Sequence, residues 1–165
     1  MYSFNPGERV SSAKFNSNFE ELETAISVLD SRADASETVL TATLSSTFTS
    51  TTSIAFQDTG LKITLPDAGT YMFHCDLRAS NGSSLNDYVT VRLYNQTTST
   101  AVTDTERIGM YPTASNQVTV PLNWPVTTVS ANTIIRVEIR PATARACQLL
   151  TNSDGKSVIV ATRIS

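Results

Sequence analysis

Residues 63–78 read ITLPDAGTYMFHCDLR, and this stretch decides the fold class. Apolar and polar side chains alternate through residues 61–65 and again through residues 71–78, which is the period-two pattern of half-buried strands. Between the two runs lies Pro66-Asp67-Ala68-Gly69, whose residue types favour a turn. The stretch therefore predicts two consecutive strands joined by a short connection.

The same alternation recurs through the rest of the chain. It returns in residues 89–93, 118–124, 135–140 and 158–164, with the turn signals Asn81-Gly82 and Asp154-Gly155 between strands. Residues 38–57 carry no charge and are rich in Ser and Thr, which indicates exposed strand or linker. Many short strands without a second helical segment are typical of an antiparallel sandwich or barrel. We therefore predict a mainly β fold.

A helical periodicity precedes the β region. Steps of four and three residues separate its apolar side chains, which are Phe15, Phe19, Leu22, Ile26, Leu29 and Ala33. This heptad spacing gives a helix one narrow apolar stripe, called here the helix seam, which a helix cannot bury alone. Ser11 and Ser12 are N-cap candidates and residues 31–36 are small and polar, so we expect the helix to end near Ala33 or Ala35. The chain should divide into residues 1–36, with the helix, and residues 37–165, with the β domain.

The helix seam predicts self-association through a trimeric coiled-coil stalk. An ordinary amphipathic helix that packs on its own domain is the alternative, because three heptads are short. The flanking positions hold Asn18, Glu23, Ala25 and Asp30, which cannot form interhelical salt bridges with one another. Copy number should then be set mainly by the β domain, with the seam acting as a stalk or a docking segment.

Composition excludes several classes of function. The chain has 165 residues, 40% of them apolar and only 16% charged, with a net charge of −3. It has no basic footprint for nucleic acid, no stretch of membrane-spanning hydrophobicity and no recognisable signal segment. We expect a soluble protein that neither binds nucleic acid nor inserts into membranes. Its two cysteines, Cys75 and Cys147, are too few for a disulfide framework and should be buried free thiols.

Candidate catalytic groups are few, and we expect no enzyme and no cofactor. The single histidine, His74, precedes Cys75, but adjacent strand residues point to opposite faces and cannot form a Cys-His pair. His74 and Asp76 share a face, which offers too few ligands for a metal site unless copies meet on a symmetry axis. Asp104 and Glu106 lie in a predicted loop, where they can help bind a cation or simply form a solvated turn.

Two aromatic residues are candidates for a partner-facing surface. Tyr111 and Trp124 each lie beside a proline, and exposed aromatic rings are common stacking sites for sugars and proteins. The alternative is that each fills a core or an interface, as most large aromatic residues do. The polar loops at residues 81–87 and 97–105 are the predicted distal, partner-facing end.

The quoted stretch resembles the strand-turn-strand of the jelly roll shared by the tumour-necrosis-factor family and the globular head of complement's first component. Its Ala68-Gly69-x-Tyr71-x-Phe73 pattern carries the resemblance, together with the order of the later strands. The resemblance implies an antiparallel jelly-roll β-sandwich that forms a homotrimer, with Tyr71 and Phe73 in the core of the trimeric head. It implies no catalysis.

The N-terminal segment FNPGERVSSAKFNSNFEELETAI resembles the opening of many phage virion proteins. This resemblance implies a virion protein assembled in the host cytoplasm: a trimeric fibre, tail appendage or capsid decoration protein. It would contact other virion proteins through its N-terminal segment, and a host surface glycan or protein through its head. The alternative interpretation is a soluble glycan- or receptor-binding module of the tumour-necrosis-factor or complement-head type.

Overall fold

The protein forms two compact units, Met1–Ser36 and Glu37–Ser165. A computed structural model describes residues 12–34, 38–81, 88–110, 117–125 and 127–165. The first unit contains α1 (Ser12–Asp34), which confirms the predicted N-terminal helix and both of its ends. On the helix seam, the side chains of Phe19, Leu22 and Ile26 are 49%, 54% and 48% exposed. The side chains of Phe15 and Leu29 lie outside the described part, and the trimeric coiled coil stays a prediction.

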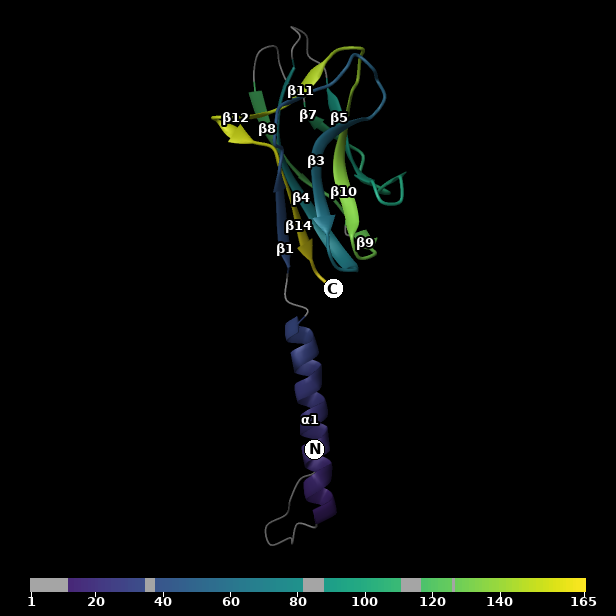
Figure 1. The fold of residues 1–165 in the computed structure, drawn as a ribbon, viewed down its shortest axis with the longest axis vertical. Helices are drawn as coiled ribbons and strands as arrows, with labels where there is room; N and C mark the ends of the chain where they lie inside the picture. Colours follow the sequence, from purple (N-terminus) through teal and green to yellow (C-terminus); the bar gives the residue numbers. More distant parts are fainter. Residues whose placement is uncertain (1–11, 35–37, 82–87, 111–116, 126) are drawn as a thin grey trace. The chain divides into compact units, whose positions relative to one another are not determined.

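The second unit consists of antiparallel strands, most of them in two sheets (Figure 1). The seven-stranded sheet contains β1 (Val39–Thr43), β2 (Phe48–Thr49), β4 (Gly69–Asn81), β8 (Gln117–Asn123), β9 (Thr127–Val129), β11 (Cys147–Leu149) and β14 (Val158–Arg163). The five-stranded sheet contains β3 (Gln57–Leu65), β5 (Val89–Asn95), β6 (Thr100–Ala101), β7 (Arg107–Met110) and β10 (Thr133–Pro141). A separate hairpin pairs β12 (Thr151–Asn152) with β13 (Gly155–Lys156). The mainly β, antiparallel fold class is confirmed.

The strand order places β4 and β10 at the centres of the two sheets. The seven-stranded sheet runs β1-β14-β4-β11-β2, with β8 and β9 also paired to β4. The five-stranded sheet runs β3-β10-β5-β6, with β7 also paired to β5. The connection at residues 66–68 therefore does not close a hairpin. It carries the chain from β3 in one sheet to β4 in the other, as Figure 1 shows.

The core lies between the two sheets and is made by the alternating apolar residues of the longer strands. Leu61, Leu65, Tyr71, Phe73, Cys75, Leu77, Val91, Leu93, Ile135, Val137, Ile139 and Ile159 are each fully enclosed, at 0% exposure. Cys75 and Cys147 are buried free thiols, as the sequence predicts. The described helix is not long and apolar enough to cross a membrane.

The structure shows why position 69 of the Ala68-Gly69-x-Tyr71-x-Phe73 pattern is a glycine. Its φ is +157°, and a Cβ there would collide with the carbonyl oxygen of Ser165. The two segments are joined by hydrogen bonds from Thr70 N to Ser165 O at 2.7 Å and from Ile164 N to Thr70 O at 2.9 Å. Glycine at this position thus lets the C-terminal segment close against the start of β4.

Candidate functional site

The outer face of the five-stranded sheet carries charged and aromatic side chains. On β10, Ile135, Val137 and Ile139 point into the core, so the residues between them point outward. The charged and aromatic residues on this outer face of β10 and β5 are Arg136, Glu138, Arg140, Arg92 and Tyr94. Strand register places Glu138 opposite Arg92 and Arg136 opposite Tyr94. This face therefore brings arginine, carboxylate and aromatic groups into direct contact.

Glu138 is the buried centre of this face, at 3% exposure. Its Oε2 lies 2.7 Å from Arg92 Nη2, and its Oε1 lies 2.5 Å from Arg136 Nη2. Arg136 Nη1 also pairs with Asp58 Oδ2 at 3.0 Å. An isolated carboxylate would be costly to bury, but each oxygen of Glu138 has its own guanidinium partner. The pairs fix the geometry of both arginines.

Gly60 makes the Asp58 contact possible. The register between β3 and β10 shifts between Arg136 and Glu138, and Gly60 lies in this bulge with a φ of +78°. Such a bulge changes which side chains lie opposite each other, and its left-handed residue is usually glycine. As a result Asp58 lies opposite Glu138 in the strand register, where its carboxylate forms an ion pair with Arg136.

Guanidinium groups and aromatic rings alternate across this face. The Cζ atoms of Arg92 and Arg140 lie 3.9 Å and 4.8 Å from the centre of the Phe56 ring. The Cζ atoms of Arg136 and Arg92 lie 4.4 Å and 5.6 Å from the centre of the Tyr94 ring. The order Arg140, Phe56, Arg92, Tyr94, Arg136 is called here the arginine–aromatic ladder. Each such cation–π contact contributes about 0.5–2 kcal/mol, depending on how far it is removed from water. The ladder holds Arg92 between two rings.

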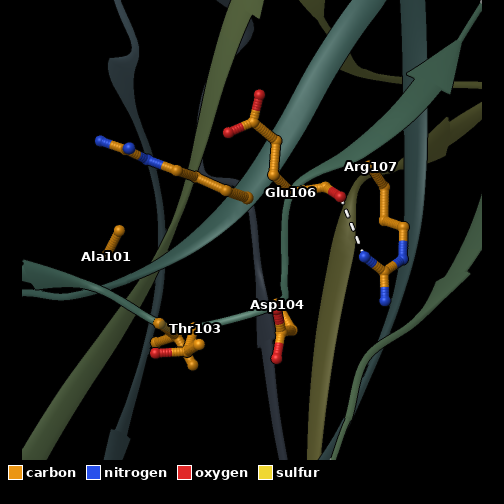
Figure 2. Close-up of a pocket in the computed structure, with 7 residues that line it drawn as sticks. Ala101, Thr103, Asp104, Glu106 and Arg107 are labelled. Carbon is orange, nitrogen blue, oxygen red and sulfur yellow. Dashed lines mark hydrogen bonds between the residues drawn. The ribbon is translucent and has the colours of Figure 1, made fainter.

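A pocket lies beside the ladder, at the edge of the sheet formed by β6 and β7. Its volume is about 450 Å³, and its lining comprises Arg92, Ala101, Val102, Thr103, Asp104, Glu106 and Arg107. Figure 2 shows the hydrogen bond from Arg107 Nη1 to the Glu106 carbonyl, at 2.9 Å. Two guanidinium groups and two carboxylates line the pocket, so their formal charges cancel. We call it the β6–β7 pocket because residues 101–107 supply most of its lining.

Hydrogen bonds of Thr105 and Trp124 hold residues 101–107, the segment that lines most of the β6–β7 pocket, against the core. Thr105 is fully buried, and its Oγ1 accepts a hydrogen bond from Leu93 N at 3.1 Å and donates one to Val102 O at 2.7 Å. The indole Nε1 of Trp124 donates to the Thr105 carbonyl at 2.6 Å. Glu106 is held from a second side by an ion pair with Arg140 of the ladder. The charged residues of the pocket therefore project from a fixed backbone.

The predicted position of His74 and Asp76 on one strand face is confirmed, on the outer side of the seven-stranded sheet. His74 Nδ1 donates to Asn123 Oδ1 at 2.8 Å, and His74 Nε2 lies 3.2 Å from Asp76 Oδ1. Cys75 points the other way into the core, where burial and then the Asp76 charge raise the pKa of its thiol. Among the described residues no group of three or more His, Cys, Asp or Glu side chains can hold a metal ion.

The aromatic residues singled out from the sequence have different outcomes. Trp124 is only 4% exposed, so its prediction as a partner-facing residue is wrong and the core alternative holds, because its ring closes the core behind Thr105. Tyr71 and Phe73 are also fully buried within their own chain. Both belong to the core cluster of a single chain, and a trimeric head built around that core stays a prediction. Tyr111 and residues 82–87 lie outside the described residues.

Sequence reasoning missed both the ladder and the pocket. The spacing Arg136-x-Glu138-x-Arg140 and the pair Arg92-x-Tyr94 are visible signals of a charged outer strand face. Phe56 gave no signal, because it precedes its strand and reaches the arginines only through the register of three strands. The sequence shows Asp104 and Glu106 as a pair of acids, but it does not indicate that Arg92 and Arg107 join them in the lining of a pocket.

Comparison with known proteins shows a likeness of fold and no closer relationship. No protein-family model matches the chain, and no curated protein is significantly similar to it in sequence. Among solved structures, the VP2 subviral particle of infectious bursal disease virus matches with a TM-score of 0.52 and 14% identity, over 78% of this chain and 33% of that one. The chain thus spans about a third of that capsid protein.

Two tumour-necrosis-factor-type structures are also similar. Eiger TNF from S. frugiperda matches with a TM-score of 0.47 and 10% identity, over 77% of this chain and 93% of that one. Murine APRIL matches with a TM-score of 0.48 and 11% identity, over 78% of this chain and 99% of that one. At these identities each of these likenesses concerns the fold alone.

Proposed function

We propose that this chain is a noncatalytic structural protein of a bacteriophage virion. It is a homotrimeric fibre, tail appendage or capsid decoration protein that attaches through its N-terminal segment and displays a jelly-roll head. The observation that carries the proposal is the helix seam, exposed in a chain whose other unit is a β-sandwich. The likeness of this sandwich to a capsid protein and the phage-like N-terminal segment support a place in a virus particle.

A strip on the outer face of the seven-stranded sheet supports self-association of the head. Val39 on β1 and Met72 on β4 are 58% and 46% exposed, and both lie beside Thr162 of β14 in the strand register. Val158 and Val160 continue the strip along β14, each of them half-buried. Exposed apolar side chains on neighbouring strands mark a surface that associates with a partner. A homotrimer would cover this strip with copies of itself.

A noncatalytic role fits the chemistry of the described residues. Nδ1 of His74 is hydrogen-bonded to Asn123 Oδ1, and its Nε2 lies 3.2 Å from Asp76 Oδ1. Cys75 lies on the opposite face of β4 and is fully buried, so it cannot act as a nucleophile with His74 as its base. The carboxylates of the β6–β7 pocket are each accompanied by an arginine in the lining.

Light scattering of the purified full chain tests the trimer. We expect a mass of three chains at micromolar concentration, independent of dilution over about a decade, because a stable interface in a symmetric oligomer should remain closed. A monodisperse monomer under these conditions would contradict the proposal.

A double variant separates the stalk from the head. Leu22→Asp with Ile26→Asp places charges on the helix seam, and we expect it to lose helical circular dichroism while remaining a trimer, because the head sets the copy number. The matched control is Thr24→Asp with Ser27→Asp, which adds the same two charges at exposed positions off the seam. It should keep both the helix signal and the trimer. Dissociation of the seam variant would assign assembly to the helix instead.

Imaging of intact particles that contain the chain tests the virion assignment. Density for the head at the facets would indicate a capsid decoration protein, and density at the tail would indicate a fibre or appendage. Absence of the chain from purified particles, measured by mass spectrometry, would contradict both.

A recognition module is the second candidate, and the β6–β7 pocket favours it. A pocket of about 450 Å³ with convergent polar groups is of the size that small-molecule sites have. This candidate does not exclude the first, because a virion protein can also bind a host surface.

A further inference from the structure

The β6–β7 pocket presents polar groups that the protein itself does not use. The carboxylate of Asp104 and the hydroxyl of Thr103 make no hydrogen bond or ion pair with the described residues. Glu106 uses Oε1 for Arg140, which leaves Oε2 without a partner in the described part of the chain. The pocket therefore offers acceptors and a hydroxyl to whatever enters it.

The charge balance of the lining indicates a neutral ligand. An ion of either sign would meet two like charges as well as two opposite ones, so the four formal charges of the lining favour neither anions nor cations. A neutral ligand with several hydroxyl groups meets no like charge. Each hydroxyl can donate to a carboxylate and accept from a guanidinium, and bonds to these charged groups are the stronger kind.

The lining is also held in place before a ligand arrives. Arg92 is fixed by Glu138 and by the Phe56 ring, and the segment behind the pocket is fixed by Thr105. A fixed site loses little conformational entropy on binding. Ala101 and Val102 add a small apolar surface that can contact the C–H groups of a ligand. Together these features match a compact polyhydroxylated ring.

We propose that the β6–β7 pocket binds one neutral sugar residue, of the kind that ends a cell-surface glycan. Asp104 and Glu106 accept hydrogen bonds from its hydroxyl groups, Arg92 and Arg107 donate to them, and Ala101 and Val102 contact its C–H face. All of these residues belong to one chain, so the site does not depend on assembly. The inference rests on the recognition part of the proposed function.

Nuclear magnetic resonance with free sugars tests the site on the full chain. The probes are the methyl glycosides of glucose, galactose and mannose and free N-acetylglucosamine, with glucuronate and N-acetylneuraminate as acidic comparators. We expect at least one neutral sugar to bind saturably, with a dissociation constant on the order of 1 mM, and to shift the backbone amide signals of residues 101–107. Binding of none of them, or of the acidic sugars alone, would overturn the proposal.

A matched pair of variants locates the binding. Asp104→Asn keeps the size of the side chain and suits the left-handed backbone there, where φ is +57°, but it removes the charged acceptor. We expect it to weaken sugar binding by about tenfold or more, the usual effect of losing a hydrogen bond to a charged group. Asp67→Asn makes the same change in the exposed turn before β4, outside the lining, and should leave affinity unchanged. Equal affinities of the two variants would overturn the site.

Light scattering on the same samples keeps the two proposals apart. A trimer that binds no sugar would contradict the sugar site and support the assembly role. A monomer that binds sugar through Asp104 would support the sugar site and contradict the assembly role.

Discussion

At the scale of single residues, Glu138 shows how one buried charge organises a surface. Its two oxygens pair with Arg92 and Arg136, and these arginines in turn contact the rings of Phe56 and Tyr94. Removing one member of a buried pair leaves its partners without compensation, which costs more than the pair itself contributes. Glu138 is thus expected to be the most sensitive polar position on this face.

Glu138→Gln tests this dependence without changing the side-chain size. We expect the free energy of unfolding to fall by about 2–4 kcal/mol, because Arg92 loses its carboxylate partner and Arg136 keeps only Asp58. Asp58→Asn is the control: it breaks the Arg136 pair at a half-exposed carboxylate, and should cost about 0–1 kcal/mol. Urea unfolding followed by circular dichroism measures both, and equal losses would contradict the central role of Glu138.

Cys75 predicts a pH dependence of stability. Burial, with a smaller effect of Asp76, raises the pKa of its thiol in the folded state above its value in the unfolded chain. The folded protein therefore holds this proton where the unfolded chain releases it, and stability should fall as pH rises above about 8.5, by at most about 1.4 kcal/mol per pH unit. Urea unfolding from pH 7 to 10 under reducing conditions measures the slope.

Cys75→Ala is the matched comparison for this slope. Its own stability is lower at every pH, but it lacks the thiol and should lose less stability between pH 8.5 and 10 than the natural chain does. Parallel curves for the two proteins would show that the thiol does not contribute.

At the scale of elements, the alternation of apolar residues predicted the long strands. β3, β4, β5, β8, β10 and β14 all fall on segments with period-two patterning. β2, β6, β9, β11, β12 and β13 have only two or three residues each, which is too few for a period to be recognised. β2, β9 and β11 pair with strands far away in sequence, whereas β6 pairs with the nearby β5 and β12 pairs with β13 in a local hairpin.

The candidate site could not be predicted to the same extent, for a related reason. The ladder depends on the register of β10 with β5 and on the bulge at Gly60. A shift of one residue in either register would turn the charged face inward. Nothing local in the sequence specifies those registers, so the strands were predictable and their lateral contacts were not.

Thr105 gives a prediction for the segment between β6 and β7. Thr105→Val removes the hydroxyl that is hydrogen-bonded to Leu93 N and Val102 O, and both backbone groups lose this partner. We therefore expect the free energy of unfolding to fall by about 1–3 kcal/mol. Thr103→Val makes the same substitution two residues away, at an exposed position without such bonds, and should be near neutral. Equal effects in thermal unfolding would argue against the anchoring role.

At the scale of the whole molecule, the outer faces of the two sheets differ in character. The five-stranded sheet presents charges that pair within the chain, whereas β1, β14 and β4 present an apolar strip around Val39, Met72 and Val160. The arginines and Glu138 of the first surface have partners within the chain, although Ile108 on β7 is 56% exposed there, whereas Val39 and Met72 of the second surface are left exposed. Assembly is therefore expected to use the seven-stranded sheet.

Met72→Lys tests which sheet faces a partner. A charge placed in a buried apolar contact carries a desolvation cost, so we expect this variant to dissociate to monomers while keeping the circular dichroism of the β head. Thr64→Lys adds the same charge at an exposed position on the five-stranded sheet and should stay trimeric. Light scattering measures both, and a trimeric Met72→Lys protein would exclude this face.

The burial of Trp124 has a practical consequence. It is the single tryptophan of the chain, and its indole is bonded to Thr105, between the two acidic residues that line the pocket. Its intrinsic fluorescence therefore arises from one known environment directly behind the pocket segment. A ligand that moves residues 103–106 would change the intensity or wavelength of that emission, so the protein contains its own optical reporter and needs no added label.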